Sequence, residues 1–247
     1  MSAEANNPLE QFTVSPIVRL PETFGIDPSL TNSALFMLIA VAVVALFFAV
    51  AMRKRATVPG RTQSLAEIIY QFVHGIVEEN TGHAGDKYFP FILTLFLFIL
   101  FVNLLGLLPY SFAPTSHIIV TFGMGAFVFL GITLIAFVKK GPIGFFKHFI
   151  PEGLPLIMAP LMLAIELVSY LSRPFSLGIR LAANMAAGHT LMQVIAAFVF
   201  PLGLFGILPI VFLMFMTGLE IFVAILQAYV FTLLSCMYLG EALSDHH

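Results

Sequence analysis

A few charged side chains are set in a long apolar stretch, residues 154–240 of the sequence. A charge near the centre of a bilayer costs about 2.5–3.5 kcal/mol on insertion scales, so membrane proteins keep such residues mainly for function. Movement of protons or ions is the chemistry that they would support, because the sequence contains no P-loop, serine-nucleophile motif or metal-binding cluster. The fully charged residues of this stretch are Glu166, Arg173, Arg180 and Glu220.

Arg180 is the most informative of these residues. Glu166, Arg173 and Arg180 are seven residues apart and would share one stripe of a helix. Arg173 could pair with Glu166, which would make both residues structural. Arg180 has no equally obvious partner and cannot lose its charge, so it must face a carboxylate, a water-filled cavity or an anion. The alternative is an arginine at a helix end that snorkels to the interface. Ser169, Ser176 and Asn184 lie close to the same stripe.

A second set of polar residues follows Arg180. His189 can take up and release protons near neutral pH, although a single buried histidine is more often only hydrogen-bonded. Glu220 and Gln227 are seven residues apart on the next apolar segment. His189 or Glu220 could pair with Arg180, or they could pair with each other. Together these residues predict a proton or ion path in which a fixed cation acts as a barrier.

The composition indicates a membrane protein. Of 247 residues, 60% are hydrophobic and 10% are charged, against about 25% charged in soluble domains. The mean hydropathy is +1.01. These values exclude a soluble, a disordered or a nucleic-acid-binding protein, and the net charge of −2 implies no polyanionic partner. The single cysteine excludes an intramolecular disulfide and a cysteine cluster, so we expect no metal and no cofactor.

The apolar runs predict an all-α polytopic protein with about five membrane spans and one interfacial amphipathic helix. By the positive-inside rule, Arg53-Lys54-Arg55 and Lys139-Lys140 mark cytoplasmic ends, which places the N-terminus outside and the C-terminus, Asp245-His246-His247, in the cytoplasm. The polar start without a transit peptide favours a bacterial inner membrane, with the N-terminus in the periplasm.

We expect one integral membrane domain, residues 1–247, made of five parts. These are a polar outer segment (1–33), a first span (34–55), a cytoplasmic amphipathic segment (56–87), a second and third span with a cytoplasmic loop (88–153), and a long hairpin with the C-terminus (154–247).

The last two apolar segments are too long to cross a bilayer upright. Residues 161–200 would form a helix of about 60 Å and residues 210–240 one of about 46 Å, against a hydrocarbon core of about 30 Å. Each must therefore break, with Pro174 a candidate kink, or both must lie steeply tilted against a partner. Residues 201–209 would join them as a hairpin.

One segment resembles a known family. Ser172-Arg-Pro-Phe-Ser-Leu-Gly-Ile-Arg180-Leu-Ala-Ala-Asn184-Met-Ala-Ala-Gly188-His189 is similar to the signature of subunit a, the membrane stator of rotary F-type ATP synthases. The family pattern, roughly S-R-P-x-S-L-x-x-R-L-x-x-N-x-x-A-G, matches at every fixed position. Asn103-Leu-Leu-Gly-Leu-Leu-Pro109-Tyr110 and Leu226-Gln227-Ala228-Tyr229-Val230-Phe231 also resemble family features, and the resemblance extends from about residue 8 to residue 243.

The resemblance implies roles for single residues. Arg180 would face the carboxylates of a rotating c-ring, promote release of their protons and block a direct leak between two offset half-channels. His189 and Glu220 would line the inlet half-channel, and Glu166 the outlet. The remaining candidates are Asn184 and Gln227 near the arginine, Asn103 and His117 on the inlet, Ser169, Tyr238 and Glu241 on the outlet, and Arg173 in a structural ion pair.

The same resemblance implies a subunit that is not an enzyme by itself. It would couple the proton gradient to ATP synthesis within the whole ATP synthase, with c-ring subunits and b-type peripheral-stalk subunits as partners in the bilayer. Its two long helices would form a steeply tilted hairpin along the ring. A secondary transporter with a midplane site is the main alternative, but transporters usually show related halves, and this sequence shows no repeat. A purely structural anchor would not retain Arg180, His189 and Glu220.

Overall fold

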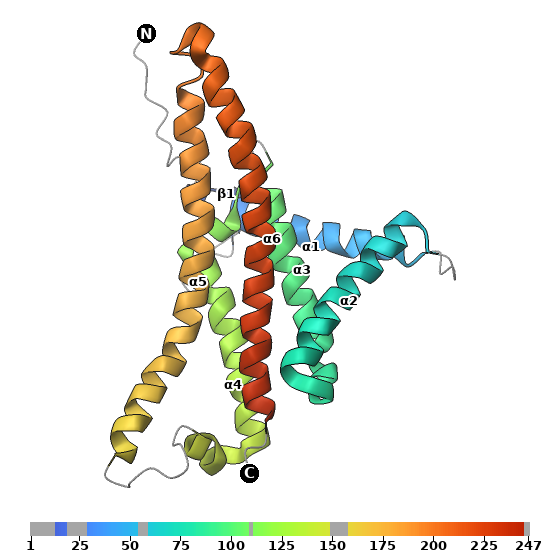
Figure 1. Cartoon of the computed structure of the whole chain (residues 1–247), viewed down its shortest axis with the longest axis vertical. Coiled ribbons are helices and arrows are strands. Elements are labelled where there is room, and N and C mark those ends of the chain that lie inside the picture. Colours follow the sequence, from blue (N-terminus) through green and yellow to red (C-terminus); the bar gives the residue numbers. More distant parts are fainter. Residues whose placement is uncertain (1–12, 19–28, 54–58, 109–110, 149–157, 245–247) are drawn as a thin grey trace. The chain divides into compact units, whose positions relative to one another are not determined.

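The computed structural model describes residues 13–18, 29–53, 59–108, 111–148 and 158–244. Several sequence-based expectations fall on residues outside these ranges, namely most of the polar N-terminal segment, Lys54 and Arg55, Pro109 and Tyr110, the end of the loop after residue 148, and Asp245-His246-His247. The described chain is helical apart from one short antiparallel pair of strands (Figure 1). Its elements are β1 (Pro16–Val18), β2 (Leu30–Thr31), α1 (Asn32–Ala51), α2 (Arg61–Thr81), η2 (Gly82–Tyr88), α3 (Phe89–Gly106), η3 (Pro114–Ser116), α4 (Ile118–His148), α5 (Ala159–Ala197), η4 (Gly203–Gly206) and α6 (Ile207–Leu243).

Polar side chains fix the start of α1. The Thr31 hydroxyl accepts a hydrogen bond from the Ala34 backbone N–H at 3.2 Å, which satisfies a donor that the first helical turn leaves free. The Asn32 side chain accepts from the Ser15 N–H and donates to the Thr13 carbonyl. The small strand pair is therefore tied to the first turn of an otherwise apolar helix.

Helix α2 confirms the predicted amphipathic segment. Val73 and Val77 are fully buried, whereas Leu65, Ile68 and Phe72 recur at helical spacing on an exposed face. The helix ends at Gly82, whose φ of +57° lies in the left-handed region that favours glycine. Its position at the cytoplasmic interface stays a prediction.

The two long helices do not break. Helix α5 has 39 residues and α6 has 37, or about 58 Å and 55 Å at 1.5 Å per residue. Residue 174 does not interrupt α5. A proline is tolerated inside membrane helices where neighbouring groups and local adjustments satisfy the freed carbonyl. The remaining explanation for their length, a steep tilt, stays a prediction.

Four described helical segments are long and apolar enough to cross a membrane: Asn32–Ala51, Arg61–Gly106, Ile118–Gly141 and Ile207–Leu243. Helix α5 is not among them, and it carries Glu166, Arg173, Arg180 and His189. Helix α4 extends beyond the predicted third span to His148, with a kink at Gly141, whose φ is +69°. The chain is thus an all-α polytopic membrane protein, as the sequence predicted.

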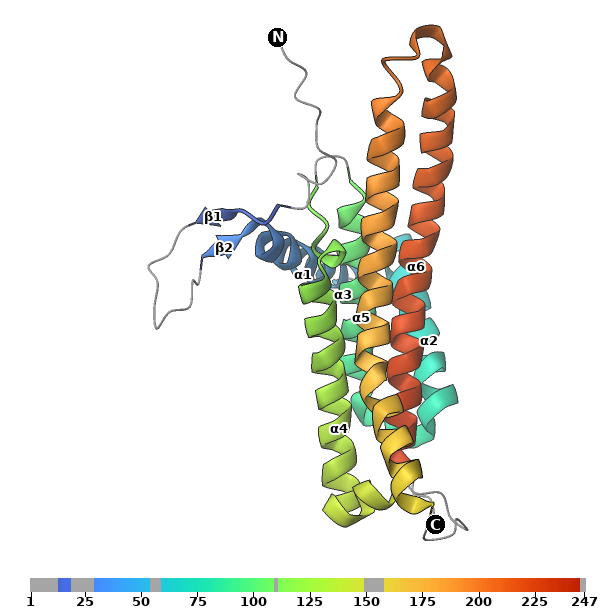
Figure 2. The ribbon, with the colours of Figure 1, turned by 90° about the vertical axis from the view of Figure 1, so that its left-hand side faces the viewer.

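The chain divides into two compact units, each assembled from three separate stretches. Unit 1 comprises residues 1–54, 97–120 and 181–228, and unit 2 comprises residues 55–96, 121–180 and 229–247. Helices α3, α4, α5 and α6 each continue from one unit into the other. In unit 1 the parts of α5 and α6 next to their connection run antiparallel and side by side (Figures 1 and 2). In unit 2, ring contacts between Phe122 and Phe175 and between Phe129 and Tyr170 pack α4 against α5.

Candidate functional site

Arg180 lies on an exposed face of α5. Its side chain makes no hydrogen bond or ion pair with any residue that the structure describes. Exposed small residues flank it along the helix, with Ser176 one turn before it and Ala183 one turn after it. The neighbouring side chains Phe175 and Ile179 are apolar and about half exposed. Arg180 is therefore a fixed cation with small and apolar side chains next to it on the exposed face of α5.

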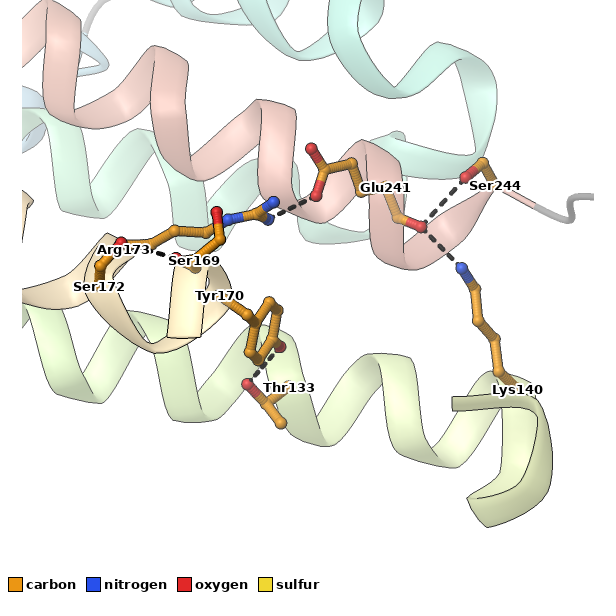
Figure 3. A network of polar contacts seen from close by, with 8 residues as sticks. All are labelled: Thr133, Lys140, Ser169, Tyr170, Ser172, Arg173, Glu241 and Ser244. Carbon is orange, nitrogen blue, oxygen red and sulfur yellow. Dashed lines mark hydrogen bonds and ion pairs between the residues drawn. The ribbon is translucent and has the colours of Figure 1, made fainter. Parts of the chain in front are cut away.

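Arg173 pairs with a different carboxylate from the one that the spacing suggested. Its Nη1 donates to Oε2 of Glu241 at the end of α6, so the possible pair with Glu166 does not form (Figure 3). Glu166 is half-buried and has no ion pair within the described ranges. The spacing within α5 allowed the Glu166 pair, but the packing of α6 against α5 brings Glu241 closer. The carboxylate that pairs with Arg173 is thus Glu241 and not Glu166, and the structural role of the pair stays a prediction.

Asn184 and Gln227 meet as a hydrogen-bonded pair in unit 1. The Asn184 Nδ2 donates to the Gln227 Oε1 at 3.0 Å. Gln227 is buried with 6% of its surface exposed, whereas Asn184 is exposed. This contact fixes the register between α5 and α6 and joins Gln227 to Asn184, which lies one helical turn after Arg180.

Glu220 and His189 provide titratable groups without protein partners in the same unit. Glu220 is 9% exposed, and its Oε2 has no hydrogen-bond partner among the residues described. The same holds for Nε2 of the half-buried His189. The two side chains do not pair with each other. A Cβ at Gly188 would overlap the Glu220 carboxylate, so this glycine makes room for the acid against the backbone of α5.

Asn103 and His117 complete the polar residues predicted for the inlet. Asn103 on α3 is fully buried, and neither of its side-chain polar atoms has a hydrogen-bond partner in the described part of the chain. His117 follows η3 and stacks on Phe112, with ring centroids 5.1 Å apart. Burial lowers the pKa of the His117 imidazole from its ordinary value of 6.5.

The outlet candidates lie in unit 2. The Tyr238 ring contacts the Arg173 guanidinium, with 4.5 Å between the guanidinium carbon and the ring centroid. Ser169 is exposed, and its carbonyl accepts a hydrogen bond from the Ser172 hydroxyl.

The polar residues predicted for the inlet all belong to unit 1, namely Asn103, His117, Asn184, His189, Glu220 and Gln227. Those predicted for the outlet all belong to unit 2, namely Glu166, Ser169, Tyr238 and Glu241, together with Arg173 and Arg180.

Sequence reasoning missed three contributors. The motif assigns no role to Gly188, whose missing side chain accommodates Glu220. Tyr170 and Thr133 share a hydrogen bond of 2.7 Å, and the guanidinium carbon of Arg173 lies 5.4 Å from the Tyr170 ring centroid. Tyr170 lies three residues before Arg173, a spacing that brings side chains together on a helix and could have identified it.

Comparison with known proteins identifies the family. The sequence profile described as ATP synthase A chain matches residues 34–240. The chain belongs to the ATP synthase subunit a family. A subunit a of Rhodospirillum rubrum is 48% identical over 242 residues, covering 98% of this chain and 100% of the relative. A relative of the same name from Wolbachia sp. subsp. Brugia malayi is 49% identical over 239 residues, covering 96% of this chain and 99% of the relative. Another, from Pelagibacter ubique, is 47% identical over 244 residues, covering 98% of this chain and 100% of the relative.

Membership in the subunit a family confirms the resemblance seen in the sequence. The chain is a proton-translocating component of the membrane sector of ATP synthase and is not catalytic by itself. Its relatives are bacterial, and its apolar helices identify it as a bacterial membrane protein.

Proposed function

We propose that this subunit carries protons along two separate half-channels, to and from carboxylates on a rotating ring of c subunits, and so couples the proton gradient to ATP synthesis. The single observation that carries the proposal is the exposed Arg180 on α5, for which the described part of the chain provides no hydrogen-bond or ion-pair partner. A charge exposed to lipid near the bilayer centre is costly, so a carboxylate of another chain is the counterion that best fits this position.

Arg180 would act on that carboxylate through its fixed charge. A guanidinium stabilises the ionised form of a facing carboxyl and so promotes release of its proton. Arginine keeps its charge at any working pH, so it also repels a proton that approaches along the path. The same residue therefore discharges each arriving carboxyl and blocks a direct leak.

The polar residues of unit 1 suit the inlet half-channel. Glu220 and His189 are titratable, and each has a buried polar atom that no described residue uses. Such atoms can bind the water molecules along which protons move. Asn184 and Gln227, held together by their hydrogen bond, would lead from this group to the turn of α5 that carries Arg180. Asn103 and His117 would lie nearer the outer end of the path.

The polar residues of unit 2 suit the outlet half-channel. Glu166 is half-buried on the α5 stripe that leads from Arg180, and Ser169 and Tyr238 add hydroxyl groups. The inlet and outlet candidates fall into different units, which is compatible with two separate paths. We place the subunit in the bacterial inner membrane with its N-terminus in the periplasm and its C-terminus in the cytoplasm, next to b-type peripheral-stalk subunits.

Arg180→Ala in the assembled ATP synthase tests the proposal. We expect inverted membrane vesicles to lose ATP-driven acidification while the complex assembles in normal amount. Arg61→Ala, which removes an exposed arginine at the start of α2, serves as the matched control and should pump normally. Unchanged pumping and ATP synthesis with Arg180→Ala would refute the assignment.

A further inference from the structure

Arg173 is held in a small cage of aromatic and acidic side chains. The guanidinium carbon lies 5.4 Å from the ring centroid of Tyr170 and 4.5 Å from that of Tyr238. The guanidinium also donates a hydrogen bond to the Glu241 carboxylate (Figure 3). Its side chain is only 18% exposed. Cation–π contacts and a charge-assisted hydrogen bond therefore fix both the position and the counterion of this arginine.

Glu241 is itself held in place by neighbouring elements. The Lys140 Nζ donates to its carbonyl oxygen at 2.8 Å, and the Ser244 hydroxyl donates to the same oxygen at 3.0 Å (Figure 3). A Cβ at Gly240 would overlap the Asn80 carbonyl, so the end of α6 lies directly against α2. Lys140 is half-buried and bonds the C-terminal end of a helix, where the partial negative charge of the helix dipole offsets part of its charge.

The cage lies on the route that the proposed function assigns to the outlet. Arg173 precedes Arg180 by two helical turns, about 10 Å along α5. A small cavity of unit 2 is lined by Tyr170, Arg173, Leu177, Ser235 and Tyr238, among others. A guanidinium without a counterion at this point would repel a passing proton. At a separation of 5–10 Å and an effective dielectric constant of about 20, this repulsion would slow passage on the order of tenfold or more.

We propose that Glu241 neutralises the charge of Arg173 so that protons can pass along the outlet. Arg173 is then a second cation on the path whose charge is balanced, whereas the charge of Arg180 is not. This inference rests on the proposed function. It assigns to the pair an electrostatic role in proton movement, in addition to its role in holding α5 and α6 together. Glu241 and Arg173 are positioning residues in this account, because neither contacts the ring carboxylate.

A purely structural role makes a different prediction for paired substitutions. If the ion pair only ties α5 to α6, its loss changes the amount of assembled complex, because a buried cation without its counterion is costly, but the pumping rate per assembled complex stays near the wild-type value. If neutrality of the outlet matters, Glu241→Gln exposes the charge of Arg173 and lowers that rate, and adding Arg173→Gln removes the charge and restores the rate. The pumping rate per assembled complex therefore separates the two roles.

The experiment compares Glu241→Gln, Arg173→Gln and the double variant in the complete ATP synthase, with ATP-driven proton pumping in inverted vesicles measured per amount of assembled complex. We expect Glu241→Gln to lower the pumping rate about tenfold, Arg173→Gln to lower it less, and the double variant to recover most of the wild-type rate. Glu79→Gln, which removes an exposed carboxylate from α2, is the matched control and should pump normally.

Pumping by Glu241→Gln at the wild-type rate, or a double variant as impaired as Glu241→Gln, would overturn the proposal. If Glu241→Gln fails to assemble, Glu241→Asp decides, because it keeps the charge: pumping per assembled complex near the wild-type rate supports the electrostatic role, and a large loss overturns it. The Arg180→Ala test is independent, because normal pumping in that variant refutes the half-channel proposal whatever the Glu241 series shows.

Discussion

The Glu220 carboxylate of α6 lies directly over the backbone of Gly188 on α5, in space that any other residue type would fill. Both residues belong to unit 1, and the acid is almost fully buried there. The glycine therefore sets how close the proposed inlet acid comes to the helix that carries Arg180 and His189.

Gly188→Ala should displace the Glu220 carboxylate and impair proton translocation. The new methyl group would overlap Oε1, and overpacking of this kind typically costs about 1–3 kcal/mol or forces the neighbour to move. ATP-driven pumping in inverted vesicles measures the effect, and we expect a clear loss. Gly131→Ala on α4 is the control, because a Cβ there has no neighbour within 4 Å. Equal pumping by the two variants would contradict the role given to Gly188.

Asn184→Ala should destabilise the packing of α5 on α6. It leaves the buried Gln227 amide without its partner, and an unsatisfied buried polar group costs about 1–3 kcal/mol. A lower melting temperature of the purified membrane sector would report this loss. Thr190→Ala removes only a bond from a side chain to the backbone of its own helix and should have little effect. A melting temperature that Asn184→Ala leaves unchanged would show that the contact contributes no stability.

Gly240→Ala should loosen the end of α6 in unit 2. Its methyl group would overlap the Asn80 carbonyl, and because backbone cannot rotate away, α6 must shift relative to α2. Because Glu241 is the next residue, its ion pair with Arg173 should weaken as well. Protease accessibility of the C-terminal segment measures the shift, and Gly75→Ala on α2, where a Cβ would have no neighbour within 4 Å, is the control. Identical cleavage rates would argue against this packing.

His117 should remain neutral at a pH at which an exposed histidine is partly charged. Burial lowers its pKa from the ordinary value of 6.5. Between that lowered pKa and 6.5 the unfolded chain binds more protons than the folded one, so acidification through this range decreases stability. A nitrogen NMR titration of histidine-labelled complex, with the signal assigned by its loss in His117→Gln, checks the prediction. A midpoint at or above 6.5 would contradict it.

Much of the fold followed from the cost of placing charges and free backbone groups in a bilayer. The apolar runs predicted the helices to within a few residues, as α1 and α3 show, and the rarity of intramembrane charge singled out Arg180, Glu220 and His189. Contacts between helices were less accessible, because one sequence does not give their register. Glu166 and Glu241 are equally good partners for Arg173 by charge, and only the packing of α6 on α5 selects Glu241. The role of Gly188 likewise depends on which residue of α6 lies opposite it.

The central claim is that the face of α5 around Arg180 contacts the ring of c subunits, and disulfide cross-linking tests it most directly. The exposed Ala183 would be replaced by cysteine and paired with a cysteine one helical turn from the ring carboxylate; the chain's own Cys236 is fully buried. Ala182→Cys is the control, because Ala182 is the adjacent residue and is buried, with 5% of its surface exposed. The account predicts rapid cross-linking from residue 183 and none from residue 182 in assembled, active complex. Absence of cross-linking from residue 183, or equal cross-linking from both positions, would contradict it.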